Sequence, residues 1–202
     1  MSDWVIIIQG PSIYTDRIKN LLSGYNIIFS TWIAEEKKYD KSDIVVLNAY
    51  PKYCGIANVF YQQTTTLNGL LKAKEMGYKN AIKIRSDMII KNPKLFIECF
   101  TNKLNFLATH TSHNGYLIDY FMGGNIDYMI DLWSFPSDIH YPFPEYAITQ
   151  QFIKMNLNKD EVSFILDKLN KDNDIDWIKY NIQISCYNNY PFYTTSFKDY
   201  SI

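Results

Sequence analysis

The sequence predicts an α/β fold, a single-domain sandwich whose mainly parallel central sheet is flanked by helices. Short apolar runs rich in β-branched residues, typical of buried parallel strands, alternate with segments of helical spacing through the first half of the chain. Turn-forming residues such as Gly10-Pro11 and Gly77 separate these runs. No repeat or linker interrupts the pattern, and 202 residues fit one domain.

The elements follow in order along the chain. In the first part, the predicted strands are residues 4–9, 26–31, 43–48 and 80–85, the predicted helices are 15–23 and 57–76, and 35–42 is a charged, turn-rich segment. Thr15 could cap the first helix, and Gly24 and Gly77 could end the two helices. In the second part, we predict helices over 93–100, 126–135, 145–155 and 161–170 and strands over 104–109 and 116–121.

Composition excludes several classes of protein. Hydrophobic residues make up 47% and charged residues 20%, which is typical of a globular chain and not of a disordered one. The net charge of -1 predicts no bulk attraction to nucleic acid or to an anionic membrane. The cysteines, Cys54, Cys99 and Cys186, are odd in number and widely spaced, which argues against a disulfide framework and favours a reduced, cytoplasmic location. We see no signal-peptide pattern, and no apolar stretch is long enough to predict a membrane span.

Polar or turn-forming residues follow each of the first four predicted strands. They are Gln9-Gly10-Pro11, Ser30-Thr31-Trp32, Asn48 and Arg85-Ser86-Asp87. In open α/β sheets, ligands bind beyond the carboxyl ends of the strands. This edge is therefore the predicted binding site.

The triplet Arg85-Ser86-Asp87 is the sharpest local feature. An acid at a strand end could hold Mg²⁺ or Mn²⁺ together with diphosphate oxygens, and Arg85 could bind a phosphate through a bidentate fork. The alternative is a structural arginine–aspartate pair at the edge of the sheet. Gly10 could let a ligand approach the backbone, but the sequence has no dinucleotide-binding or P-loop pattern.

Other candidates lie on the long helix and in the second half. Asn58, Gln62 and Thr65 or Thr66 would share one face of the helix, which could bind a ligand or simply be solvated. Asp119 interrupts an apolar strand, and Glu145 opens a helix after a proline, where it could also serve as a favourable N-terminal charge. Either acid could be a general base. His110, His113 and His140 lack metal-completing neighbours in the sequence, so structural roles are favoured.

The strand-end segments, taken in order over about residues 5 to 150, resemble the WavE family of lipopolysaccharide-synthesis proteins and related GT-A glycosyltransferases. The resembling pieces are Ile8-Gln9-Gly10-Pro11, Ser30-Thr31-Trp32, Asn58 with Gln62, Thr65, Thr66 and Gly69-Leu70, Lys83-Ile84-Arg85-Ser86-Asp87, Asp119-Tyr120-Phe121-Met122-Gly123, Asp131-Leu132-Trp133 and Pro144-Glu145.

The resemblance implies a GT-A fold, a nucleotide-diphosphate-sugar donor and a glycan acceptor. It implies a nucleotide-binding part at about residues 1–90 and an acceptor-side part at about 91–202. The resemblance also implies which residues would bind the donor: Gln9, Gly10, Pro11, Thr31, Asn58, Gln62, Arg85, Ser86 and Asp87. Arg85 stands where the usual metal motif has its first acid, so Asp87 alone would be the protein ligand of Mn²⁺ or Mg²⁺, and Arg85 could neutralise diphosphate charge in the metal's place.

The mechanism that follows is an inverting displacement, in which an acid activates the acceptor hydroxyl. Glu145 is favoured slightly over Asp119 for this role. Two alternatives stay open. One is a non-catalytic nucleotide-sugar or glycan-binding module of the same fold. The other is a sugar nucleotidyltransferase, although residues 12–18 do not supply the glycine- and basic-rich loop that such an enzyme usually needs.

Overall fold

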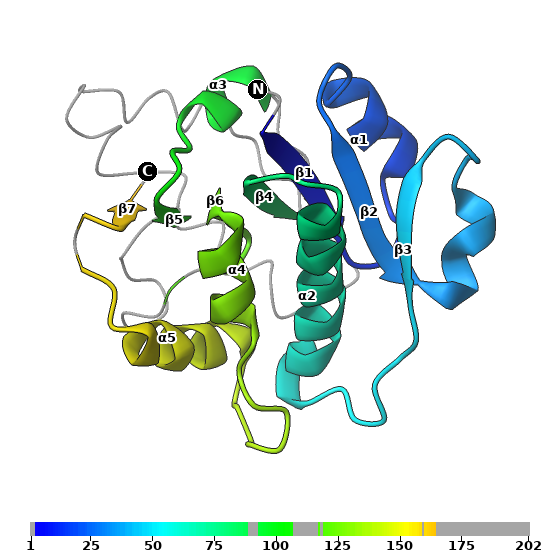
Figure 1. Cartoon of the computed structure of the whole chain (residues 1–202). Helices are drawn as coiled ribbons and strands as arrows, with labels where there is room; N and C mark the ends of the chain where they lie inside the picture. The colour runs from blue at the N-terminus through cyan, green and yellow to red at the C-terminus, as the bar shows by residue number, and fades with distance from the viewer. Residues whose placement is uncertain (1–2, 89–92, 107–116, 118, 159, 165–202) are drawn as a thin grey trace, which may run out of the picture.

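The computed structural model describes residues 3–88, 93–106, 117, 119–158 and 160–164 (Figure 1). Its strands are β1 (Trp4–Gln9), β2 (Ile27–Trp32), β3 (Ile44–Asn48), β4 (Asn80–Arg85), β5 (Leu104–Phe106), β6 (Phe121–Asn125) and β7 (Val162–Phe164). Its helices are α1 (Thr15–Leu21), α2 (Val59–Glu75), α3 (Pro93–Glu98), α4 (Ile126–Trp133) and α5 (Pro144–Met155), with short 3-10 helices η1 (Ile33–Lys38) and η2 (Ile56–Asn58).

The seven described strands form one sheet in the order β3-β2-β1-β4-β6-β5-β7. The pairings β1–β2, β1–β4, β2–β3 and β5–β7 are parallel, and β6 runs antiparallel to both of its neighbours. The predicted α/β class with a mainly parallel sheet flanked by helices is therefore confirmed. The chain leaves β1 on one side for β2 and β3 and crosses to the other side for β4, which makes β1/β4 the point where strand order reverses.

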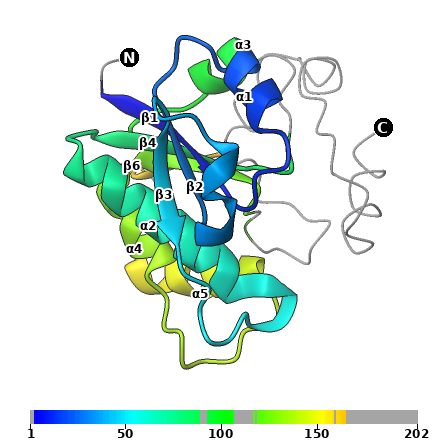
Figure 2. The same ribbon diagram turned by 90° about the vertical axis from the view of Figure 1, so that its right-hand side faces the viewer.

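Side chains alternate along β1 between two cores, as a strand buried on both faces requires. Ile7 points into the core built with α2, α4 and α5, whereas Ile6 and Ile8 face the core that holds Ile18 of α1 and Phe96 of α3. Figure 2 shows α1 and α3 on one side of the sheet and α2, α4 and α5 on the other. The sheet is thus the middle layer of three.

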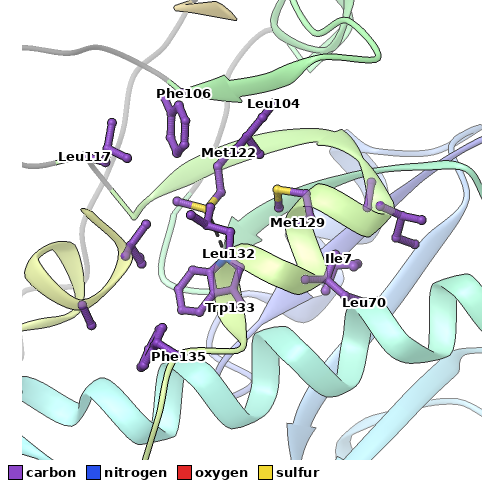
Figure 3. Close-up of a cluster of buried hydrophobic side chains, with 14 of the residues drawn as sticks. Ile7, Leu70, Leu104, Phe106, Leu117, Met122, Met129, Leu132, Trp133 and Phe135 are labelled. Atoms are coloured by element: carbon purple, nitrogen blue, oxygen red, sulfur yellow. Dashed lines mark hydrogen bonds between the residues drawn. The ribbon is translucent and has the colours of Figure 1, made fainter. Parts of the chain in front are cut away.

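The larger core is centred on Trp133, at the end of α4, which is fully buried between Met122 of β6 and Phe135 (Figure 3). Its indole nitrogen donates to the Met122 sulfur at 3.1 Å. The side-chain amide of Gln63 on α2 donates to the backbone carbonyls of Trp133 and Phe135, at 3.1 and 2.5 Å. These bonds satisfy carbonyls at the end of α4 and tie it to α2.

Helix α2 crosses the sheet closely because Gly69 has no side chain. A Cβ atom there would lie 2.7 Å from Cγ2 of Ile7 and 3.1 Å from Cβ of Ser30. This approach sets how deeply the first turns of α2 reach toward the ends of β1 and β2.

Several predicted boundaries in the first half are wrong by a few residues. Helix α1 is preceded by Tyr14, which makes no side-chain capping bond, so Thr15 lies inside the helix instead of capping it. Helix α2 starts at Val59, because Ala57 and Asn58 have positive φ angles of 51° and 61°. Asn58 is therefore not on the helical face predicted for it. Part of the predicted turn segment 35–42 lies in η1.

Two predictions in the second half are wrong: one predicted helix is a strand, and one predicted strand has shifted bounds. Residues 162–164, predicted as helix, form β7 because they pair with β5. Glu161 lies in the turn before this strand, and residues 165–170 of the predicted helix lie outside the described residues. The strand predicted over 116–121 starts at Phe121 and runs through Gly123, where a Cβ atom would lie 2.7 Å from the carbonyl oxygen of Ala81. Of the strand predicted over 104–109, the described part forms β5.

Candidate functional site

A pocket of about 230 Å³ opens at the carboxyl ends of β1 and β4, where strand order reverses. It is lined by Gln9, Gly10, Pro11, Ile13, Trp32, Tyr50, Ala57, Asn58, Tyr61, Gln62, Arg85, Ser86 and Asp87. The structure thus brings together eight of the nine residues predicted to bind the donor: Gln9, Gly10, Pro11, Asn58, Gln62, Arg85, Ser86 and Asp87. The ninth, Thr31, is buried beside the pocket and donates its hydroxyl to Glu35.

The turns after β1 and β4 fit against each other because Gly10 lacks a side chain. Gly10 has a φ angle of +113°, and a Cβ atom there would lie 2.9 Å from the hydroxyl oxygen of Ser86. The Ser86 amide donates to the Gln9 carbonyl at 2.9 Å, and the Gly10 amide donates to the Ser30 carbonyl at 3.0 Å. A larger residue at position 10 would be strained and would push the two turns apart.

The amide of Gln9 has a defined orientation. The Thr65 hydroxyl lies 2.9 Å from the Tyr61 carbonyl of its own helix and donates its proton there. It can therefore only accept from Gln9, whose Nε2 lies 2.8 Å away. The other atom of that amide, Oε1, is buried and has no hydrogen-bond partner among the described residues. The side-chain carbonyl oxygen of Gln62 is also buried and also has no hydrogen-bond partner among the described residues.

Aromatic rings form one wall of the pocket. Trp32 and Tyr50 stack with ring centroids 4.3 Å apart and an interplanar angle of 18°, and Tyr61 packs edge-on against Trp32 at 5.1 Å. Trp32 is buried, whereas Tyr50 is 53% exposed. The wall thus offers a flat apolar surface on which a base or sugar ring can stack.

Arg85 and Asp87 form a forked ion pair in the pocket wall. The Nε and Nη2 atoms of Arg85 donate to the two carboxylate oxygens of Asp87 at 2.9 and 2.5 Å. Both Asp87 oxygens are thus engaged, and the described residues include no cluster of three histidine, cysteine or acidic side chains able to hold a metal. With both of its oxygens bound to Arg85, the Asp87 carboxylate offers no preformed site for Mn²⁺ or Mg²⁺, which a single carboxylate would hold only together with phosphate oxygens and water.

The candidate bases Asp119 and Glu145 lie together, behind Arg85 and outside the pocket lining. The Asp119 Oδ2 atom is 3.9 Å from Nη1 of Arg85 and 3.7 Å from Nζ of Lys83, which also donates to the Asp119 backbone carbonyl. Burial and the negative charge of Asp119 raise the pKa of Glu145 to about 8. Burial lowers the pKa of Lys83 to about 8, against the opposing attraction of Asp119.

Four contributors to the site were missed from the sequence: Lys83, Glu35 and the two tyrosines of the wall, Tyr50 and Tyr61. Lys83 had a usable signal, since a lysine inside an otherwise apolar buried strand needs a partner. Glu35 accepts from the Ser12 amide at 2.9 Å, from Thr31 and from Lys38 at 2.9 Å, and so ties the loop after β1 to η1. No local sequence pattern predicts that Glu35 contacts the loop after β1. His110 and His113 lie outside the described residues.

No protein-family model matches the sequence, and no curated protein matches it. The resemblance to the WavE family therefore stays a prediction. No helix among the described residues has the length and apolar character needed to cross a membrane. Among solved structures, the chain is similar to the 4-diphosphocytidyl-2C-methyl-D-erythritol synthase of Anaerococcus prevotii, at 13% identity and a TM-score of 0.48, over 80% of this chain and 85% of that one. A likeness this distant says nothing of the reaction.

Proposed function

We propose that this chain transfers a sugar from a nucleotide-diphosphate sugar to a hydroxyl of a glycan acceptor. The observation that carries the proposal is the joint placement, in one pocket at the β1/β4 switch point, of an aromatic wall and an arginine. The wall suits a base or sugar ring, and the guanidinium suits a diphosphate. In this proposal residues 1–90 bind the nucleotide, and the rest of the chain binds the acceptor.

Arg85 would take the part that a divalent cation has in many transferases of this kind. Because both oxygens of Asp87 are bound to Arg85, we derive no step through a cation. Negative charge builds on the diphosphate as its bond to the anomeric carbon breaks, and a fixed guanidinium next to that oxygen stabilises the transition state. Arg85 is held in place for this by Asp87.

The acceptor hydroxyl would give its proton to the Asp119–Glu145 pair. Its oxygen then bonds to the anomeric carbon, the bond from that carbon to the diphosphate oxygen breaks, and the nucleoside diphosphate leaves with both electrons of that bond. The acceptor must reach the pair past Arg85, since neither acid lines the pocket. Loss of a positioned base lowers a rate by about 10²–10⁴-fold.

A second candidate, a binding module that holds a nucleotide sugar without turnover, is favoured by the burial of both acids. A panel of nucleotide sugars, each with and without Mn²⁺, separates the two. We expect one nucleotide to raise the melting temperature of the wild type and of Lys72→Ala, an exposed control on α2, but not of Arg85→Ala. Release of nucleoside diphosphate would then support transfer, and binding without release from any donor would support the module. Binding unaffected by Arg85→Ala would contradict both.

A further inference from the structure

Five ionisable side chains are buried together at the back of the pocket: Lys83, Arg85, Asp87, Asp119 and Glu145. Lys83 and Asp119 are completely inaccessible, and the other three are at most 9% exposed. Two cations face three acids. Burying a net charge is costly, so a cluster of this kind is favoured when one acid carries a proton and the charges cancel.

The contacts decide which acid is protonated. The carboxylate of Asp87 is engaged by the fork of Arg85. Asp119 has two cations near one oxygen, Nζ of Lys83 at 3.7 Å and Nη1 of Arg85 at 3.9 Å. Glu145 has no ion pair with any described cation; the charge that acts on it most strongly is that of Asp119, and the charge of Arg85 opposes this effect more weakly. Coulomb energy therefore places the proton on Glu145.

We propose that Lys83 is a positioning residue that keeps Asp119 ionised and so makes Glu145 the proton-carrying member of a buried carboxyl pair. Lys83 acts from within the sheet. Its ammonium group donates to the backbone carbonyl of Asp119 and lies 5.0 Å from the ring centre of Trp133 on α4, so it is held on two sides. From this position it fixes both the backbone and the charge of Asp119.

The surroundings agree with this distribution of charge. The elements around the pair contribute Lys83 and Arg85 from β4, Asp87 beyond it, Asp119 before β6, and Glu145 from α5. On the same side of the sheet, α4 and α2 contribute Trp133 and Gln63, which do not titrate. Burial first, and then the charge of Asp119, raises the pKa of Glu145 to about 8, so the acid form prevails at neutral pH.

The inference deepens the proposed function by naming which carboxyl group can accept a proton. A protonated Glu145 cannot be the base, so Asp119 would take the proton of the acceptor hydroxyl. Only the role of Asp119 as the base rests on the proposed function. The location of the proton is measured without any substrate, so the two can fail separately.

The test is a ¹³C NMR titration of the full chain labelled at the aspartate and glutamate carboxyl carbons, with signals assigned through Glu145→Gln and Asp119→Asn. We expect the Glu145 signal to keep its carboxylic-acid position through pH 7 and to change near pH 8, while Asp119 stays a carboxylate. In Lys83→Met, the Asp119 signal should move toward the acid form at pH 7. Lys79→Met, which removes an exposed lysine directly before β4, should leave both signals unchanged. A Glu145 signal that titrates near the ordinary glutamate pKa of 4.5 would overturn the proposal.

If Lys83→Met does not fold, urea denaturation at pH 7 keeps the proposal testable. Glutamine resembles a protonated glutamate, so Glu145→Gln should unfold at the wild-type urea midpoint or above it. Asp119→Asn leaves Lys83 buried without its carboxylate and should unfold at a clearly lower midpoint. Equal losses in the two variants would show that both acids are ionised and would refute the assignment.

Discussion

Gln9 and Arg85 are direct register partners on the parallel strands β1 and β4, so their side chains leave the sheet on the same face. Gln9 contacts α2 through Thr65, and Arg85 contacts Asp87 and Asp119. The strand pairing therefore puts an amide and a guanidinium beside each other at the bottom of the pocket.

The first prediction concerns Asp87, which holds the guanidinium that a diphosphate would need. In Asp87→Ala, Arg85 loses a competing carboxylate, so we expect metal-free affinity for a nucleoside diphosphate to rise, on the order of tenfold or 1.4 kcal/mol. Isothermal titration calorimetry in the presence of a chelator measures this. Asp127→Ala, which removes an exposed acid on α4, controls for net charge. The opposite result would be a lower affinity in Asp87→Ala together with wild-type binding that requires Mn²⁺ in place of the chelator. That result would mean that Asp87 is a metal ligand.

The second prediction concerns the aromatic wall. Tyr50 is half exposed, so Tyr50→Ala should leave the fold intact while removing a stacking surface. We expect nucleotide affinity to fall by about 1–3 kcal/mol and Tyr50→Phe to restore it. Tyr53→Ala is the matched control, since Tyr53 is similarly exposed but does not line the pocket. Equal affinities for Tyr50→Ala and the control would show that no ring stacks there.

The third prediction concerns the close approach of α2 to the sheet. Gly69→Ala places a methyl group against Ile7 and Ser30, with its nearest contact at 2.7 Å, and should lower the free energy of unfolding by about 1–3 kcal/mol. Urea denaturation followed by circular dichroism measures the loss. Leu71→Ala, on the exposed side of α2, should change stability far less. Unchanged stability in Gly69→Ala would mean that α2 can move away from the sheet at little cost.

The fourth prediction is a minimum of stability near pH 8. The folded chain keeps a proton on Glu145 between about pH 4.5 and 8 that the unfolded chain has released, so stability falls as pH rises through this range. Lys83 loses its proton from about pH 8 in the folded chain but only near 10.5 when unfolded, so stability then rises with pH. Each slope is at most about 1.4 kcal/mol per pH unit.

Urea midpoints measured between pH 5.5 and 10 would reveal this curve. Glu145→Gln should flatten the acid side and leave the alkaline side in place. Stability that rises steadily from pH 5.5 to 8 would contradict the raised pKa of Glu145.

The strands of the first half were predictable because each is a short apolar run, and β1, β2 and β4 are almost entirely buried. The carboxyl-edge rule then located Gln9, Arg85 and Asp87 from the sequence. Strand β7 was not predictable, because residues 162–164 become a strand only by pairing with β5, far away in the chain. The buried position of Lys83 did carry a local signal, but its partner could not be named, because Asp119 is 36 residues away and no local pattern connects the two.

The reversed direction of β6 has a consequence for how such a site can change. Residues that precede β1, β2, β3 and β4 lie at the edge of the sheet opposite the pocket. Because β6 is antiparallel to β4, its first residue lies at the carboxyl end of β4. Asp119 and Tyr120, which directly precede β6, therefore lie at the same edge of the sheet as the pocket. Substitutions at Asp119 and Tyr120 can therefore change the back of the pocket from outside the sheet, while every parallel strand pairing beneath the pocket is preserved.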